Sequence, residues 1–364
     1  MMSKIPYGRQ NIDQNDIDAI VSTLQSDYLT QGPKVGEFES KFAEYVGSRY
    51  AVAVNNATSG LHLSILSLNL CKGDRVITTP ITFAASANCI RYAGAEVWFA
   101  DIDPNTYLLD INSVKELIES KPKGFFKGII PVDFAGLPIN LELFRNLADN
   151  HGLWIVEDAA CGFGATYDGQ HVGHFGSAGV FSFHPRKLIC TGEGGAITTN
   201  DDDLAEGCKA IRIHGTKKDK YNSEIIGLNG RLDSIQAAVL LEKLSIFDDE
   251  LEMRNIVDCT YRKYLNNAQY HPKDYQSSHA LFSITLANQT QRDSLIDRLS
   301  KSKIPSVIYY KFPIHLMKAF SYLGYRKYDL PLSENLSKTI VSLPMHPYLA
   351  QNDIEYIIEV LKIA

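Results

Sequence analysis

The sequence of 364 residues lacks the features of a membrane-bound or exported protein. No apolar run approaches the length that spans a bilayer, and the N-terminal segment MMSKIPYGRQNIDQNDIDAI has no apolar core of signal-peptide length. We therefore expect no membrane association and a cytoplasmic location.

An excess of basic residues is also absent. The chain carries 36 Lys and Arg against 42 Asp and Glu, a formal net charge of -6, and has no Lys/Arg-rich tract that would follow a phosphate backbone. Nucleic acid is therefore not an expected partner. The hydrophobic content of 45% and the charged content of 21% are ordinary for a globular enzyme long enough to form two domains.

Paired cysteines and clusters of metal ligands are missing too. The six cysteines lie far apart without a CxxC pair, so we expect reduced thiols rather than disulfides or a zinc site. His171 and His174 in HVGH have no third ligand near them in the sequence, so no metal is expected. GFGATYDG lacks the full dinucleotide fingerprint, which argues against a nicotinamide cofactor.

Short apolar runs alternate with stretches of helical period over the first part of the chain. Amphipathic stretches such as TSGLHLSILSLNL, NSVKELIESK and NLELFRNLADNHG separate most of these runs. The pattern predicts an α/β fold with a mainly parallel central sheet and helices on both faces, and ligands gather at the carboxyl ends of such strands. The predicted strands are residues 50–55, 75–80, 96–102, 128–134, 153–159, 179–184 and 195–200.

The pattern changes after the helical segment GLNGRLDSIQAAVLLEKLSIFDDELEMRN. ALFSITL predicts a strand, QRDSLIDRLSKSKI a helix and NDIEYIIEVLKIA a closing helix. We therefore expect a large domain over residues 1–246 and a smaller C-terminal α+β domain over residues 247–364, although no Pro- or Ser-rich linker marks the boundary.

Polar and aromatic residues follow several of the predicted strands. Asp158 ends LWIVED, where a partly desolvated carboxylate needs a cationic partner. Thr58 or Ser59 is the predicted cap of a helix that begins after YAVAV, and the free N–H groups of such a helix start bind anions. Ser182 and Phe83 come from the ends of two other strands.

Lys187 lies in the segment FSFHPRKLICTGEGG, beside a strand end. An amine, a carboxylate, an anion site and an aromatic ring together describe a site for a flat, phosphorylated, cationic ring with an aldehyde, which is pyridoxal phosphate. Asp158 would keep the pyridine nitrogen protonated. Lys187 would form a Schiff base with the aldehyde and later act as a base, provided that desolvation lowers its pKa towards neutrality.

Each of these residues also has a simpler explanation. Taken alone, Lys187 is more often a solvated loop lysine, Asp158 a helix cap and Phe83 a core aromatic, and GEGG is more often only a turn. The combination favours the cofactor site, because otherwise several unrelated residues would have to lie at corresponding strand ends by chance.

Several blocks of the chain carry a family resemblance over nearly its whole length. FSFHPRKLICTGEGGAITTN resembles the lysine segment of the DegT/DnrJ/EryC1 sugar aminotransferases, which are fold type I pyridoxal phosphate enzymes. DYLTQGPKVGEFESKFAEYVGSRYAVAVNNATSGLHL, TTPITFAASANC, VEDAACGFGA and GLNGRLDSIQAAVL match other blocks of that family in the same order. The resemblance implies transfer of an amino group from L-glutamate to a keto group of a nucleotide-linked deoxysugar.

The resemblance also implies roles for individual residues. Lys187 resembles the Schiff-base lysine, Asp158 the partner of the pyridinium nitrogen, and Phe83 the aromatic that stacks on the ring. The resemblance implies phosphate ligands at Ala57, Thr58, Ser59 and Ser182. Asn229 resembles an asparagine that reaches the phosphate of the neighbouring subunit, which implies a homodimer with shared active sites.

Other positions carry weaker implications. Cys161 stands where family members commonly have Gln or His next to the cofactor's ring oxygen, so that contact is expected to be weak or absent, and we interpret the cysteine as the mark of a subgroup. Tyr7, His184 and His315 are the candidate contacts to the substrate.

The sequence leaves the substrate open. SDYLTQGP and PITFAASANC are most similar to transaminases that aminate C4 of a UDP-linked 4-keto-6-deoxy-N-acetylhexosamine for pseudaminic acid, the assignment that we favour. FSFHPRK and EDAACGFGA are similar to GDP-perosamine synthases, and a C3 aminotransferase acting on a dTDP-sugar is a further alternative. Two minor alternatives are a pyridoxamine phosphate-dependent sugar dehydratase, in which histidine replaces the lysine, and a non-catalytic regulator.

Overall fold

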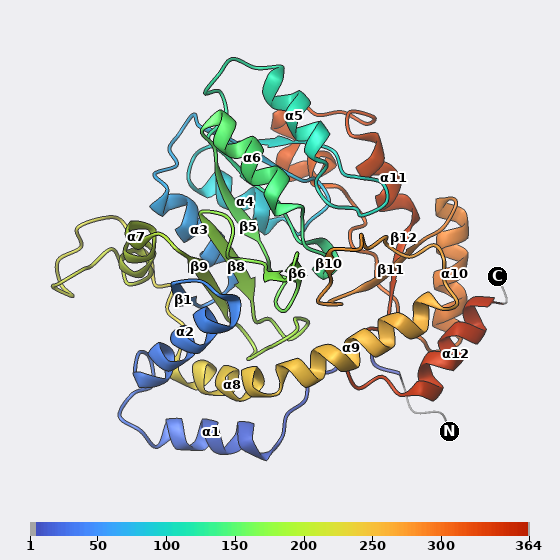
Figure 1. Cartoon of the computed structure of the whole chain (residues 1–364), viewed down its shortest axis with the longest axis horizontal. Helices are drawn as coiled ribbons and strands as arrows, with labels where there is room; N and C mark the ends of the chain where they lie inside the picture. Colours follow the sequence, from blue (N-terminus) through green and yellow to red (C-terminus); the bar gives the residue numbers. More distant parts are fainter. Residues whose placement is uncertain (1–4, 363–364) are drawn as a thin grey trace.

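The computed structural model describes residues 5–362, which form a central sheet enclosed by helices (Figure 1). The seven strands of the sheet lie in the order β1-β9-β8-β5-β4-β2-β3. All neighbours are parallel except β9, which runs antiparallel to both β1 and β8. The strands are β1 (Tyr50–Val54), β2 (Arg75–Thr78), β3 (Glu96–Phe99), β4 (Gly128–Ile130), β5 (Trp154–Asp158), β8 (Ala178–Ser182) and β9 (Gly195–Thr199).

The predicted fold class is confirmed, since each of these strands lies within or beside a segment that was predicted from its apolar run. The reversed direction of β9 has a local cause. A loop of residues 183–194, rather than a crossover helix, joins β8 to β9, and an antiparallel neighbour is what so short a connection allows.

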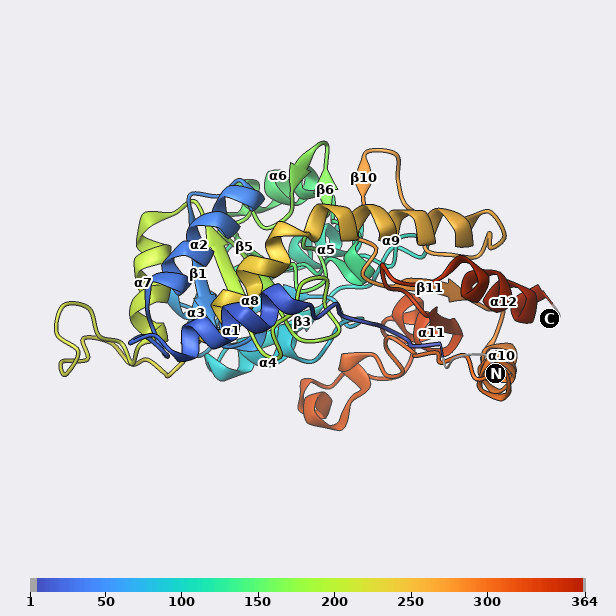
Figure 2. The same cartoon turned by 90° about the horizontal axis from the view of Figure 1, so that it is seen from below.

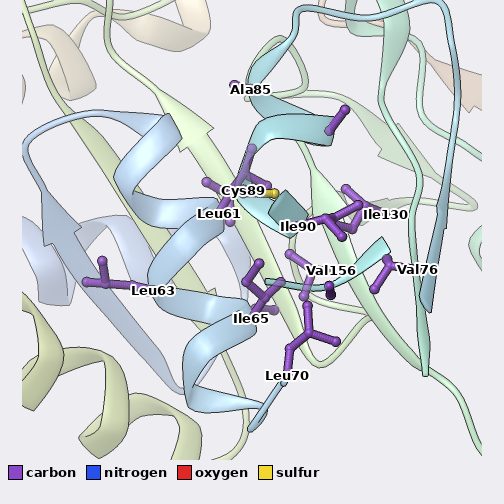
Figure 3. Packing of buried hydrophobic residues seen from close by; sticks show 14 of the residues in the cluster. Leu61, Leu63, Ile65, Leu70, Val76, Ala85, Cys89, Ile90, Ile130 and Val156 are labelled. Atoms are coloured by element: carbon purple, nitrogen blue, oxygen red, sulfur yellow. The ribbon is translucent and has the colours of Figure 1, made fainter. Parts of the chain in front are cut away.

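Helices cover both faces of the sheet. On one face, α3 (Ala57–Ser67), α4 (Ala85–Tyr92) and α7 (Asp202–Arg212) pack on the valines and isoleucines of the strands, and Figure 3 shows Leu61, Ile65 and Ile90 against Val156 and its neighbours. On the other face lie α2 (Pro33–Val46), α5 (Ile111–Glu119), α6 (Leu141–His151) and α8 (Ser234–Ser245). Burial on both faces explains why the strands are almost uniformly apolar.

The C-terminal part has its own core around a two-stranded antiparallel sheet of β11 (Phe282–Thr285) and β12 (Ile340–Leu343). Around it lie α10 (Gln289–Lys301), α11 (Pro331–Thr339) and α12 (Gln351–Lys362). The long helix α9 (Phe247–Arg262) joins the two parts (Figure 2), because Phe247 packs in the core of the first part and Tyr261 in that of the second.

The remaining elements lie at the periphery. Helix α1 (Gln14–Leu24) packs on α8. A small three-stranded sheet consists of β6 (Thr166–Tyr167), β7 (Gln170–His171) and β10 (Tyr275–Gln276), and three short 3-10 helices cover Phe134–Gly136, Ile314–Leu316 and Lys318–Leu323. Within residues 5–362, none of the helices combines the length and the apolar character that crossing a bilayer requires.

Candidate active site

Several of the predicted site residues come together at one edge of the central sheet. Because β1, β2, β5 and β8 run in the same direction, their carboxyl ends share that edge. Helix α3 begins there after β1, Phe83 follows β2, Asp158 ends β5 and Ser182 ends β8. Segments far apart in the sequence therefore supply one site.

The start of α3 forms the candidate phosphate cradle. The backbone N–H groups of Ala57 and Thr58 have no protein acceptor within residues 5–362. Such free N–H groups at the positive end of a helix dipole bind anions. The prediction that Thr58 or Ser59 caps this helix is wrong: the cap is Asn56, whose side chain accepts a hydrogen bond of 2.8 Å from the Ser59 N–H.

Gly195 completes the cradle at the start of β9. It pairs with Ser182 on one side and with Val54 on the other, which places Ser182 beside the end of β1 where α3 begins. A Cβ at position 195 would lie 2.7 Å from Ala57 N and 2.8 Å from Phe181 O, so only glycine permits this approach.

Asp158 is buried, with an exposed fraction of 5%. Its Oδ2 accepts a hydrogen bond of 2.6 Å from Ser86 Oγ, and its Oδ1 accepts one of 3.2 Å from Ala160 N. Burial raises the pKa of Asp158 above its usual value, while Ser86, Lys187 and Ala160 oppose that rise. The carboxylate is thus placed to receive a cationic partner, as expected from its position at the end of a buried strand.

Lys187 lies in the loop between β8 and β9, where its backbone N–H donates a hydrogen bond of 2.8 Å to the backbone O of His184. Its Nζ donates to Cys161 Sγ at 3.0 Å. Burial lowers the pKa of Lys187, but Cys161, Asp158 and Tyr309 outweigh burial, and the net direction is upward. The expectation that desolvation brings the pKa of this lysine towards neutrality is therefore wrong for this arrangement, because the acidic neighbours dominate.

Phe83 is 66% exposed, between β2 and α4. This exposure excludes its simpler explanation as a core aromatic and leaves an apolar ring available for stacking by a ligand. Cys161 is half-buried and contacts Lys187, so the position that departs from the family pattern lies beside the amine.

Three residues of the site were not predicted from the sequence. Ser86, on the first turn of α4, holds Asp158. Tyr309 accepts a hydrogen bond of 3.2 Å from Arg186 and contributes to the raised pKa of Lys187. For Tyr310, burial and then the charges of Cys161 and Asp158 raise the pKa of the hydroxyl. The two tyrosines come from the C-terminal part, in the segment YYKFPIHL, whose only predicted site residue is His315.

The three candidate substrate contacts have different positions. The Tyr7 ring lies 6.4 Å from the Tyr309 ring, next to the site, and burial raises the pKa of its hydroxyl. His184 is exposed, two residues after Ser182. His315 is only 1% exposed and lies 3.4 Å from Glu334, so the structure does not present it to a substrate.

Asn229 is exposed near the cradle. Its backbone O accepts a hydrogen bond of 3.5 Å from Asn55, which follows β1, and its side chain accepts one of 3.0 Å from Arg231.

These features fit pyridoxal phosphate. The free N–H groups of Ala57 and Thr58 suit its phosphate, the exposed ring of Phe83 suits its pyridine ring, and Asp158 and Lys187 suit its ring nitrogen and its aldehyde.

Curated relatives match almost the whole chain. A "Pleiotropic regulatory protein" of Geobacillus stearothermophilus is 36% identical over 341 residues, which cover 92% of this chain and 90% of that protein. A UDP-4-amino-4,6-dideoxy-N-acetyl-beta-L-altrosamine transaminase of Campylobacter jejuni is 34% identical over 367 residues, covering 98% of this chain and 96% of that protein. A GDP-perosamine synthase of Caulobacter vibrioides is 33% identical over 370 residues, covering 99% and 98%.

Solved structures agree with the fold. A DegT DnrJ EryC1 StrS aminotransferase from Brucella abortus superimposes with a TM-score of 0.91 at 37% identity and covers 96% of this chain and 94% of that chain. DesV of S. venezuelae, in complex with a ketimine intermediate, superimposes with a TM-score of 0.93 at 30% identity and covers 100% and 98%.

The sequence also matches the DegT/DnrJ/EryC1/StrS aminotransferase family over residues 10–362. The chain therefore belongs to this family and is a pyridoxal phosphate-dependent transaminase of fold type I.

Proposed function

We propose that the protein transfers an amino group from L-glutamate to the C4 keto group of a nucleotide-linked 4-keto-6-deoxy sugar, for cell-surface polysaccharide or glycan biosynthesis. The observation that carries this proposal is the placement of Lys187 Nζ, 3.0 Å from Cys161 and within the field of Asp158, beside a helix start with two free N–H groups.

Each residue then has a defined task. When bound, pyridoxal phosphate supplies the electron sink for deprotonation of the carbon that bears the amino group. Asp158, held by Ser86, keeps the ring nitrogen protonated, and the start of α3 fixes the phosphate. The Lys187 amine binds the aldehyde and, once released from it, carries the proton between the substrate carbon and the cofactor carbon.

The visible absorption of the purified protein, before and after addition of L-glutamate, tests the first half of the reaction. We expect a yellow wild-type protein that bleaches with glutamate and releases 2-oxoglutarate, and a Lys187→Ala variant that folds but neither bleaches nor turns over. A variant that turned over at the wild-type rate would overturn the role of Lys187.

For the substrate, we favour a UDP-linked N-acetyl sugar. Support comes from the Campylobacter jejuni transaminase, while the GDP-perosamine synthase is nearly as similar. The test is a panel of UDP-, GDP- and dTDP-linked keto sugars, each added to enzyme that has already accepted the amino group of glutamate. NMR of the product distinguishes amination at C4 from amination at C3. Turnover of the GDP- or dTDP-linked sugar alone would replace the UDP assignment.

Two other functions receive less support. A dehydratase of this fold would carry histidine in place of Lys187, and the chain has lysine. The only support for a regulatory role among the relatives described above is that the Geobacillus stearothermophilus protein is named a pleiotropic regulatory protein. Formation of 2-oxoglutarate from glutamate separates the aminotransferase from both.

We further propose a homodimer whose two active sites are shared through Asn229. Exposed apolar side chains support such an interface. Tyr221 and Ile226, on the loop that projects after α7 in Figure 1, are 86% and 96% exposed. Ile17, Val21 and Leu24 form an exposed stripe on α1. Exposed apolar surface of this extent favours association.

The proposal also includes a domain division and a cellular compartment. We retain the division into residues 1–246 and 247–364, supported by the separate core around β11 and β12, with α9 spanning both parts. We propose the cytoplasm as the compartment, because all six cysteines are free thiols.

A further inference from the structure

Two acidic side chains lie fully buried behind the site and take no part in the proposed function. Glu157 precedes Asp158 in β5, and Asp133 follows β4, the neighbouring strand. Both side chains are 0% exposed. Among the described residues, neither carboxyl group forms an ion pair with a lysine, arginine or histidine. Burying two uncompensated carboxylates would be costly.

In each of the two carboxyl groups, only one oxygen accepts a hydrogen bond. Glu157 Oε2 accepts a hydrogen bond of 2.5 Å from Gly173 N, and Asp133 Oδ1 accepts one of 3.2 Å from Ile139 N. Glu157 Oε1 and Asp133 Oδ2 are buried and have no donor within residues 5–362.

Val132 pairs with Asp158 across the two parallel strands, so Asp133 and Glu157 lie on the same face of the sheet. A Cβ at Gly162 would meet both Asp133 Oδ2 and Val172, and the next residue, Gly173, donates to Glu157, so the two carboxyl groups share one buried region. One proton held between Asp133 Oδ2 and Glu157 Oε1 would give both of these acceptor oxygens a partner.

We propose that Asp133 and Glu157 share one proton and act as a positioning pair for Asp158, carrying one negative charge instead of two. The proton belongs to Asp133, which donates to Glu157.

The pKa shifts of the two carboxyl groups agree with this assignment. Burial, and then the charge of Glu157, raises the pKa of Asp133 well above its usual range. Burial raises the pKa of Glu157 to about 7, and the Gly173 N–H and the hydrogen bond from Asp133 limit that rise. Asp158 is the third charged group that acts on both, and its negative charge also favours retention of the proton.

The backbone connects the pair to the active site. Asp133 N donates to Asp158 O at 3.1 Å, and Asp158 N donates to Pro131 O at 2.9 Å. Gly162, which follows Cys161, lies against the pair, since a Cβ there would be 2.5 Å from Asp133 Oδ2. A closed hydrogen bond between Asp133 and Glu157 therefore fixes both the strand end that bears Asp158 and the turn that bears Cys161.

Amide substitutions separate one shared proton from two independent charges. In Asp133→Asn or Glu157→Gln, the amide NH₂ can donate to the remaining carboxylate, so that the hydrogen bond and the single negative charge both persist. The double variant Asp133→Asn/Glu157→Gln can keep an amide–amide hydrogen bond but loses the charge. The two single variants are thus matched controls for the double variant.

Infrared difference spectroscopy of the cofactor-free protein is the first readout, because the carbonyl stretch of a protonated carboxylic acid is separate from the carboxylate bands. We expect the wild type at neutral pH to show an acid band that is missing in Asp133→Asn. Absence of any band that depends on Asp133 would overturn the proposal, and this result would leave the aminotransferase assignment untouched.

The pH titration of the cofactor's absorption in the holoenzyme is the second readout and rests on the proposed function. A nearby negative charge stabilises the protonated forms of the site. The double variant should therefore shift the midpoint to lower pH by about one unit, and each single variant should stay near the wild type. A single variant that shifts the midpoint as far as the double variant does would contradict the shared proton.

Stability gives a readout that needs no cofactor. Because the pKa of Glu157 is raised to about 7 in the folded protein, its contribution to stability is present at low pH and is lost as the pH rises towards 7. Comparing Tm against pH, we expect this decline to be smaller in Glu157→Gln than in the wild type. The exposed Glu116→Gln is the control and should retain the wild-type slope. An unchanged slope in Glu157→Gln would count against the raised pKa and so against the pair.

Discussion

Ser86 Oγ donates to Asp158 Oδ2 at 2.6 Å, and this single hydroxyl is the residue-scale contact on which the buried carboxylate most depends. Ser86 is itself fully buried, so no water can replace the bond without a change in packing. The bond opposes the rise in the pKa of Asp158 that burial causes.

Replacing Ser86 with alanine should therefore raise the pKa of Asp158 further. The acidic limb of the pH–rate profile should move to higher pH, and turnover at neutral pH should fall about tenfold, because a protonated Asp158 no longer supports a protonated pyridine nitrogen. The measurement is kcat against pH.

Ser64→Ala is the matched control for this variant. It also removes a buried hydroxyl, but one that donates to Gly60 O within α3. A wild-type pH profile in Ser86→Ala, or the same shift in both variants, would argue against a specific role of Ser86.

At the scale of the element, the glycine-rich segment has a structural role that its sequence alone did not reveal. The sequence GEGG is typical of an ordinary turn, whereas Gly195 opens β9 against the start of α3. The loop between β8 and β9 carries Lys187 beside the same cradle. The close approach of two backbones, rather than a turn, is what requires glycine here.

Gly195→Ala should weaken retention of the cofactor by tenfold or more, because a Cβ 2.7 Å from Ala57 N forces the cradle to move. Fluorescence or absorbance titration of the cofactor-free protein with pyridoxal phosphate measures this loss.

Gly36→Ala is the control, since an added Cβ meets nothing within 4 Å in helix α2. It should bind the cofactor as the wild type does and gain about 1 kcal/mol of stability. Equal affinity in the two variants would show that the cradle tolerates a side chain.

At the scale of the whole molecule, the proposed shared sites predict complementation between two impaired variants. Lys187→Ala lacks the amine, and Asn229→Ala lacks the contact proposed to reach the neighbouring phosphate. In a mixed dimer, one site combines the intact Lys187 of one subunit with the intact Asn229 of the other, while the second site has lost both.

Co-refolding or subunit exchange of the two variants should therefore restore activity above the sum of the separate variants, up to one working site per mixed dimer. Static light scattering would establish the dimer, and kcat per mole of cofactor would measure the recovery. Activity no greater than that sum, or unchanged cofactor affinity in Asn229→Ala, would remove the shared-site proposal.

Much of the architecture was predictable because local patterns encode it. Each strand of the central sheet is a short apolar run, and the amphipathic stretches between them became helices. The placement of Phe83, Asp158 and Lys187 after strands that share one edge of the sheet also followed, since the carboxyl ends of parallel strands must lie at the same edge.

What depends on contacts between distant segments was not predictable. The capping of α3 by Asn56, the burial of His315 beside Glu334, and the approach of Tyr309 and Tyr310 from the C-terminal part follow from packing that no local pattern records. The sequence by itself determined the order of strands and helices along the chain and the chemical groups at the strand ends. The tertiary structure alone decided the electrostatics of those groups: burial raises the pKa values of Asp158 and of the acid pair, whereas acidic neighbours raise the pKa of Lys187 against the effect of burial. Burial and neighbouring charges both arise only when the chain is packed.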